Sequence, residues 1–361
     1  MAWTWEEIDA DWLAGGRVAV SPEVITDAFN RVEDLLGRDW LEQPRINSGV
    51  IERGSFPTLR IVSMGQRLGS LKSVRHPEKL LERIRTGGTN AEAELTALYL
   101  VAAAQTSITL ELEPDVTVGG RKRQPDFRVH RPGTPWTYVE VTQPSDSEQQ
   151  EEVKATLATL SGLLARVKTS FALEVFLRRN PSAAESEYLA RYIPTFCQED
   201  GMHLEELPDQ LGKLFLNHDE PGRPVVRTHQ GEEGLSGSFA IAATRGPDEP
   251  HRHVMVRIAF TDDRAAKFLK KKASQLPKER PGLIMIETSN ATGAFGSWEP
   301  LLTRRFQPHR HTRVSAVCLW RSGQEQAPGG AIWKARTNLL LNPHANFRLP
   351  RWITESLARF Q

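Results

Sequence analysis

Two acidic residues in neighbouring alternating segments are the clearest chemical feature of the sequence. Asp126 lies in the segment 125–130 and Glu140 in the segment 136–141, and both segments alternate apolar and polar residues. The residues between the two segments include Pro-Gly, which favours a turn, so the pair predicts a β-hairpin. If the hairpin is symmetric about Gly133, Asp126 lies opposite Glu140.

The alternation separates apolar from polar side chains across this hairpin. One face is expected to carry Phe127, Val129, Val139 and Val141, and the other Asp126, Arg128, Glu140 and Thr142. Carboxylates opposed at about 5 Å repel each other. A divalent cation such as Mg²⁺ or Mn²⁺ would remove the conflict, and so would a raised carboxyl pKa or neutralisation by Arg128.

A third carboxylate comes from the segment just before the hairpin. Residues 91–105 are predicted to form a helix with Asn90 as its cap, and both Glu92 and Glu94 fall in its first turn. Either glutamate could reach the strand carboxylates, and both could instead act only as partners of the helix dipole, which is the better explanation for Glu92.

This order of residues resembles the PD-(D/E)xK nuclease superfamily. The matching motifs are Glu94-Leu95 on a helix, Pro125-Asp126 on a strand, and Val139-Glu140-Val141-Thr142 on the next strand. The resemblance covers about residues 90–180, where a predicted helix at 149–167 and a strand at 172–177 would complete the family's order of helix, strands, helix and strand. It implies an α/β fold of the restriction-endonuclease-like type, with a mixed sheet flanked by helices.

The resemblance implies hydrolysis of a phosphodiester by metal-activated water. It assigns Asp126, Glu140 and the backbone carbonyl of Val141 to a Mg²⁺ or Mn²⁺ ion, with Glu94 assisting. DNA is the expected substrate because most of the superfamily acts on DNA. Restriction, repair or anti-phage defence are the expected settings.

The sequence departs from the family's pattern at Thr142, where the motif has a lysine. A hydroxyl group cannot supply the positive charge that lysine places near the attacking water. Lys154 in the following predicted helix, or Lys122 before the Asp126 strand, is expected to replace it. Gln143 could orient water without adding charge.

Two other functions remain open from the sequence. The first is a nuclease-like protein that has lost catalysis and binds nucleic acid or a protein partner. The second is a hydrolase centred on Glu287, at the end of the predicted strand 283–287, with the hairpin serving only as structure.

Basic residues gather in clusters although the formal net charge is only +1. Local clusters of this kind can attract a polyanion without a high total charge. The residues expected to contact nucleic-acid phosphates are Lys122, Arg123, Arg128, Lys270 and Lys271.

Composition excludes several classes of protein. The sequence has only two cysteines, too few for a disulfide framework or a four-thiolate zinc site. Its longest apolar run is well short of the roughly 20 residues that span a bilayer, and its first residues lack the features of a secretory signal. The sequence therefore predicts a soluble, cytoplasmic protein.

Three regions are expected along the chain. Residues 1–86 are predicted to be a mainly helical accessory segment, with a helix starting at Ser21-Pro22 and a strand at 59–62. Residues 87–200 are the expected nuclease core, and residues 201–361 a C-terminal α/β domain or sheet extension. The outer regions are expected to supply specificity, dimerisation or a contact with a partner protein.

Overall fold

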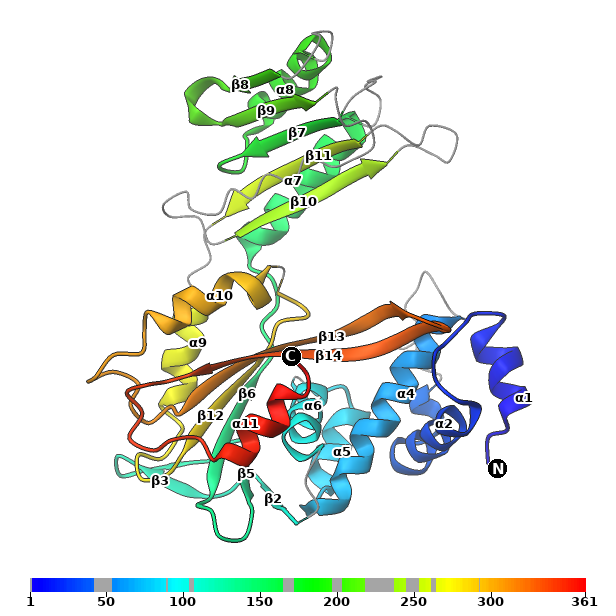
Figure 1. Cartoon of the computed structure of the whole chain (residues 1–361), viewed down its shortest axis with the longest axis vertical. Coiled ribbons are helices and arrows are strands. Elements are labelled where there is room, and N and C mark those ends of the chain that lie inside the picture. Colours follow the sequence, from blue (N-terminus) through cyan, green and yellow to red (C-terminus); the bar gives the residue numbers. More distant parts are fainter. Residues whose placement is uncertain are drawn as a thin grey trace. The chain divides into compact units, whose positions relative to one another are not determined.

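The computed structural model describes most of the chain as a mixed α/β protein (Figure 1). The described residues are 2–41, 54–88, 90–103, 107–164, 172–196, 203–217, 237–244, 253–260, 264–291 and 293–361. They divide into two compact units. Unit 1 is Met1–Pro144, Ala265–Asn290 and Glu299–Gln361, and unit 2 is Ser145–Arg264 and Ala291–Trp298.

A seven-stranded mixed sheet organises unit 1. Its order is β1 (Val74–Arg75), β2 (Thr109–Leu112), β5 (Phe127–His130), β6 (Thr137–Thr142), β12 (Gly282–Glu287), β13 (Ala316–Ala327) and β14 (Gly330–Leu341). β6 runs antiparallel to β5 and parallel to β12, so it lies inside the sheet and is buried along its whole length. A separate two-stranded ribbon joins β3 (Val116–Val118) to β4 (Arg121–Arg123).

Nine of the described helices lie wholly or partly in unit 1. They are α1 (Trp5–Ile8), α2 (Pro22–Leu36), α3 (Arg38–Leu41), α4 (Ser55–Gly69), α5 (Glu78–Arg85), α6 (Ala91–Ala102), α9 (Arg264–Ala273), α10 (Ala294–Thr303) and α11 (Arg351–Ala358), of which α9 and α10 cross the boundary between the units. α6 contributes Leu95 and Leu98 to an apolar core that includes Val139 and Val141 of β6. The helix is therefore fixed against the strand that carries Glu140.

The chain leaves the main sheet after β6 and returns to it only at β12. Unit 2 occupies most of the intervening sequence, and α9 directly precedes the return. In the order of the chain, the larger part of unit 2, Ser145–Arg264, is thus inserted between two parallel neighbours of one sheet, and its shorter part, Ala291–Trp298, follows β12. Apart from its first residue, Arg264, the crossover helix α9 belongs to unit 1.

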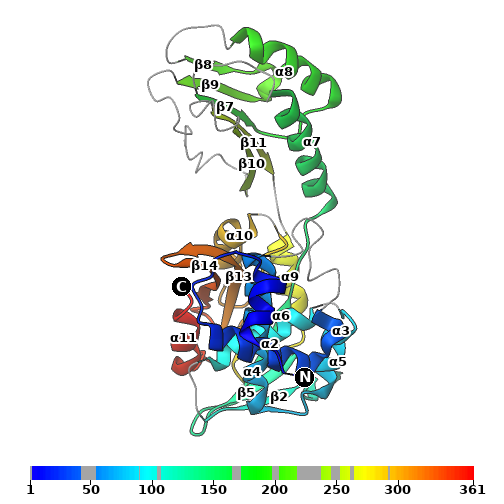
Figure 2. The same cartoon turned by 90° about the vertical axis from the view of Figure 1, so that its right-hand side faces the viewer.

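Unit 2 has its own sheet and apolar core (Figure 2). The strand order is β10 (Gly237–Thr244), β11 (His253–Phe260), β7 (Ala172–Leu177), β9 (Gly212–Asn217) and β8 (His203–Glu206), accompanied by α7 (Glu148–Leu164) and α8 (Ala183–Phe196). Leu157 of α7 and Leu189 of α8 are buried against strand residues such as Val175.

Two expectations from the sequence are corrected here. The helix 149–167 and strand 172–177 form as α7 and β7, but they lie in unit 2 and do not complete the main sheet; β12 does, preceded by α9. The two compact units have other bounds than the expected regions 1–86, 87–200 and 201–361. The strand expected at 59–62 is part of α4, a helix buried on most of its sides, so that Leu59, Ile61 and Val62 are all buried within it.

The predicted helix start at Ser21-Pro22 is confirmed, since Ser21 is the N-cap of α2 and Pro22 its first residue. In the described part of the chain, no helix combines the length and apolar character needed to cross a membrane.

The crossing of α2 and α4 depends on a glycine. A Cβ atom added at Gly65 would lie 2.6 Å from the Cα atom of Ala28, closer than real contacts allow. We expect Gly65→Val to lower the free energy of unfolding by about 2–4 kcal/mol, because the two helices must separate. Urea denaturation measures this change. Gly323→Ala is the control, since its added Cβ meets nothing within 4 Å; equal losses in both variants would contradict the account.

Candidate functional site

The hairpin has the register that the sequence predicts. Phe127 pairs with Val139 and Arg128 with Tyr138, so the next position places Asp126 across from Glu140. The side chains of Phe127 and Val139 are fully buried, as expected for the apolar face. The two carboxylates therefore come from adjacent strands at one level of the sheet.

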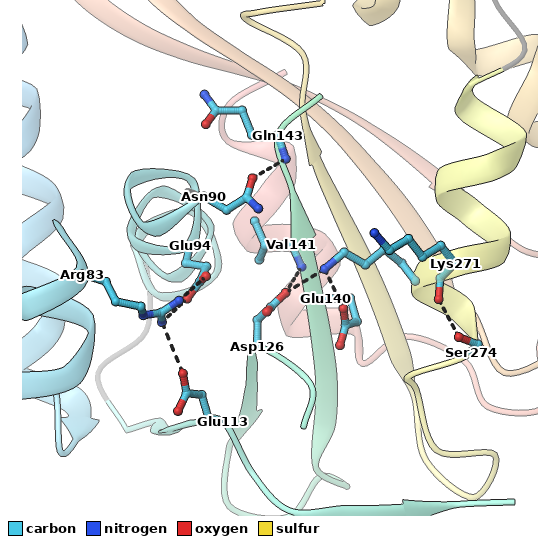
Figure 3. Close-up of polar contacts among 11 residues, drawn as sticks. Arg83, Asn90, Glu94, Glu113, Asp126, Glu140, Val141, Gln143, Lys271 and Ser274 are labelled. Carbon is cyan, nitrogen blue, oxygen red and sulfur yellow. Dashed lines mark hydrogen bonds and ion pairs between the residues drawn. The ribbon is translucent and has the colours of Figure 1, made fainter. Parts of the chain in front are cut away.

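A lysine from a distant part of the sequence lies between these carboxylates. The Nζ atom of Lys272, near the end of α9, is 2.8 Å from Glu140 Oε2 and 3.4 Å from Asp126 Oδ2. Asp126 Oδ2 also accepts a hydrogen bond of 2.5 Å from the backbone N–H of Val141 (Figure 3). One ammonium group therefore contacts both acidic side chains.

Glu140 is the most strongly perturbed group of the site. Its side chain is only 1% exposed. Burial, followed by the negative charge of Asp126, raises the pKa of Glu140 to about 8, although Lys272 acts in the opposite direction. Glu140 Oε1 is buried without a hydrogen-bond partner in the described structure. This oxygen is available to an additional cation.

The surroundings of Lys272 favour the protonated, positively charged form of its ammonium group. Burial alone lowers the pKa of this ammonium, but the combined charges of Asp126 and Glu140 outweigh burial and raise it. Lys272 therefore stays protonated near neutral pH and supplies a fixed positive charge in the site.

Glu94 lies beside this group but has a different partner. Arg83 of α5 donates to both of its carboxylate oxygens, at 2.8 and 2.6 Å, and the same guanidinium lies 3.6 Å from Glu113 (Figure 3). Burial raises the pKa of Glu94, and Asp126 adds to that increase, whereas Arg83 lowers it. The Arg83 pair holds Glu94 in place on the side of the site formed by α6.

The start of α6 is tied to the end of β6. Asn90 is the N-cap of α6, as predicted, but its side chain makes no capping bond. Its Oδ1 atom instead accepts a hydrogen bond of 3.0 Å from the backbone N–H of Gln143 (Figure 3). This contact fixes the position of Glu94, one turn into the helix, relative to Glu140 on the strand. Thr142 is buried as the last residue of β6.

The lysines predicted to replace the motif lysine lie elsewhere. Lys154 is on α7 in unit 2, where it pairs with Asp146 and Glu151. Lys122 is exposed on β4. Neither forms an ion pair with Asp126 or Glu140 in the described structure; Lys272 occupies that position.

The predicted nucleic-acid contacts differ in how available they are. Lys270 and Lys271 are exposed on α9, and Arg123 is half-buried on β4. Arg128 is engaged, because Glu111 accepts from its Nε and Nη2 atoms at 3.0 and 2.7 Å and its guanidinium lies 4.3 Å from the Trp136 ring centroid. Of these residues, Lys270 and Lys271 are therefore exposed and lie next to Lys272 in the sequence.

The residues present fit a divalent metal ion that is completed by solvent or substrate. No three His, Cys, Asp or Glu side chains converge as a metal-binding group in the described part of the chain. Mg²⁺ is commonly held by one or two carboxylates together with water and substrate phosphate. Asp126 and Glu140, whose Oε1 atom has no hydrogen-bond partner in the described structure, supply two such carboxylates.

Sequence reasoning missed Lys272 and Arg83. The basic helix around Lys270 is predicted from the sequence only as a surface for phosphates. Lys272 could have been found by asking which helix makes the crossover to the strand beside Glu140, because that helix must pass near the strand's end. Arg83 belongs to none of the motifs that the sequence offers.

Glu287, the centre of an alternative hydrolase, ends β12 and is buried. Burial raises its pKa, and the nearby charge of Arg67 acts against this increase. The hydroxyl of Ser289 donates to Glu287 Oε1 at 3.2 Å. A second carboxylate for such a hydrolase could come from Asp262 or Asp263, and both lie outside the described residues.

The Arg83–Glu94 pair is expected to stabilise unit 1. In Arg83→Gln, the buried carboxylate of Glu94 loses its main counter-charge, so we expect unfolding to require about 2–4 kcal/mol less free energy. Lys79→Gln on the same helix is the control, since the Lys79 side chain is 82% exposed. Chemical denaturation of both variants tests this; a loss below about 0.5 kcal/mol for Arg83→Gln would contradict it.

The raised pKa of Glu140 predicts how the stability of the protein depends on pH. Its pKa is about 8 in the folded protein and 4.5 for an unperturbed glutamate, so the folded state holds a proton that the unfolded state loses between these values. Stability of the metal-free protein should therefore fall as pH rises from about 5 to 8. Glu140→Gln should remove most of this slope in denaturation curves, with Glu355→Gln as an exposed control; an unchanged slope would contradict the assignment.

Comparisons of the chain with protein-family models, curated proteins and solved structures find no match.

Proposed function

We propose that the protein is a metal-dependent phosphodiesterase that cleaves DNA internally, of the PD-(D/E)xK type. The observation that carries the proposal is the convergence of Asp126, Glu140 and Lys272, with one ammonium nitrogen within 3.4 Å of both carboxylates. Two carboxylates and a cation at one point of a sheet match the groups that the resemblance requires.

The topology of unit 1 supports the same proposal. The resemblance requires a helix, then strands, then a helix and a strand that joins the sheet. α6, the strands β2, β5 and β6, then α9 and β12 supply this order when unit 2 is treated as an insertion. β12 joins the sheet by pairing in parallel with β6, the strand that carries Glu140.

Lys272 replaces the motif lysine, whose position in this sequence is occupied by Thr142. It reaches Glu140 Oε2 from α9 and not from the strand, yet it places its charge beside the same carboxylate. We infer that this ammonium offsets negative charge on the phosphate and orients the attacking water, the role assigned to the motif lysine. The separation of Lys272 from Thr142 in the sequence does not affect this role, because the role depends only on the position of the Nζ atom.

Asp126, Glu140 and the Val141 carbonyl would hold the metal ion. When bound, the ion would activate water and neutralise charge on the scissile phosphate. In the overall reaction, a water oxygen forms a bond to phosphorus, the bond to the leaving sugar oxygen breaks, and that oxygen takes up a proton. Because Glu140 has a pKa of about 8, it must lose its proton before it can bind the ion, so activity should rise with pH up to about 8.

The exposed lysines of α9 provide a phosphate-binding surface next to the site. Lys270 and Lys271 directly precede Lys272 on this helix. Contacts between such side chains and backbone phosphates weaken as salt concentration increases. A DNA strand held by α9 would have its backbone near the carboxylates.

Cleavage assays on the full chain test the proposal. With Mg²⁺ or Mn²⁺, wild type should cut circular and linear DNA, and Asp126→Ala should lose at least about 1,000-fold in rate because a metal ligand is removed. Lys272→Met should lose about 100-fold or more, with partial recovery in Lys272→Arg. Gel-based rates under single-turnover conditions give these values.

Lys278→Ala is the matched control, since Lys278 is an exposed lysine beyond α9. Its rate should stay within about twofold of wild type. Circular dichroism must show that each variant is folded. Full activity in folded Lys272→Met would contradict the role of this lysine. Salt-dependent DNA binding without any cleavage would instead favour the alternative of a nuclease-like protein that binds but does not cut. The ion pair of Glu94 with Arg83 is a reason to test this alternative, because both Glu94 oxygens already have a partner.

A further inference from the structure

Unit 1 contains a second pocket that the cleavage site does not use. It has a volume of about 370 Å³, within the range of small-molecule sites. Its walls come from α4, α6, β14 and the end of the chain after α11, and none of Asp126, Glu140 or Lys272 lines it. The pocket is therefore a separate feature of the same unit.

A buried arginine lines this pocket. Arg67 of α4 is only 7% exposed. Its Nε atom donates to the Ser63 carbonyl at 3.1 Å and its Nη1 atom donates to Thr96 Oγ1 at 2.7 Å. No carboxylate forms an ion pair with it in the part of the chain that the structure describes. Burial of an unpaired charge is unfavourable, so a ligand with a negative charge would be stabilised beside it.

The groups around Arg67 do not remove its preference for a negatively charged ligand. Burial lowers the pKa of Arg67, and the charges of Glu92 and Glu287 offset that effect only in part. Lys334, Arg336 and Arg359 also line the pocket, and no aspartate or glutamate does. Arg336 and Lys334 share the carboxylate of Glu325, at 2.6 and 3.9 Å, but Arg359 and Arg67 remain to meet an anion.

Aromatic rings form the other part of the wall. Tyr99 and Phe360 both line the pocket, with ring centroids 5.9 Å apart. Trp333 also lines it and packs against Phe56 at 5.6 Å. Flat aromatic surfaces beside cationic side chains suit a ligand that has both a planar ring and an anionic group.

We propose that this pocket binds a nucleoside phosphate, with the phosphate on Arg67 and Arg359 and the base against the aromatic rings. A free nucleotide and the terminal nucleotide of a strand share this chemistry. The helix α6 carries both Thr96, at this pocket, and Glu94, at the other site. Binding itself does not depend on the proposed nuclease activity.

Calorimetric titration of the full chain tests the proposal. The probes are AMP, adenosine, inorganic phosphate and a 5′-phosphorylated adenine trinucleotide. AMP or the trinucleotide should bind at least about tenfold more tightly than adenosine or phosphate alone, and the tighter of the two identifies the source. Failure of both to bind at millimolar concentration, or equal binding of phosphate and AMP, would overturn the proposal.

Variants locate the binding. Arg359→Gln should weaken AMP or trinucleotide binding about tenfold, and Tyr99→Leu about fivefold, whereas Arg351→Gln on α11 should stay within about twofold. Arg67→Met is the stronger test, provided that circular dichroism shows it folded; Arg359→Gln keeps the test valid if it is not. Asp126→Asn should bind like wild type, which separates this result from the outcome at the nuclease site. Unchanged binding in both Arg359→Gln and Tyr99→Leu would overturn the location.

Discussion

The pairing of one ammonium with two carboxylates on adjacent strands is the interaction on which this site depends. β6 lies inside the sheet, and the side chains of Glu140 and of Ile284, its neighbour on β12, are buried. Two negative charges there would repel each other strongly at low dielectric. Lys272 and the raised pKa of Glu140 together reduce that repulsion. A group that keeps a proton in this setting is also one that can exchange it for a metal ion.

The insertion of unit 2 explains why the site is assembled from distant segments. Lys272 and Glu140 are 132 residues apart in sequence, yet they are neighbours because α9 leads into the strand beside β6. The inserted unit has its own sheet and core, so it does not need to interrupt the packing of unit 1. The charge of the motif lysine can therefore come from a helix while Thr142 remains on the strand.

Much of the local structure could be predicted from the sequence, but the assembly could not. Alternation around Gly133 predicted the hairpin and its register, because a two-residue period leaves few ways to bury Phe127 and Val139. The prediction for the segment 59–62 was wrong, since its short apolar run fits a strand or a buried helix equally well. Lys272 was missed because motif spacing assumes a continuous core, and the Arg83–Glu94 pair because ion pairs between helices leave no periodic signal.

The most direct measurement is the number of protons released when the full chain binds Mn²⁺ at pH 6.5. Calorimetry in buffers of different ionisation enthalpy provides this number. If Asp126 and Glu140 hold the ion, Glu140 must give up its proton, so wild type should release close to one proton per ion and Glu140→Gln close to none. Equal proton release in both proteins, or no Mn²⁺ binding by wild type at millimolar concentration, would contradict the account.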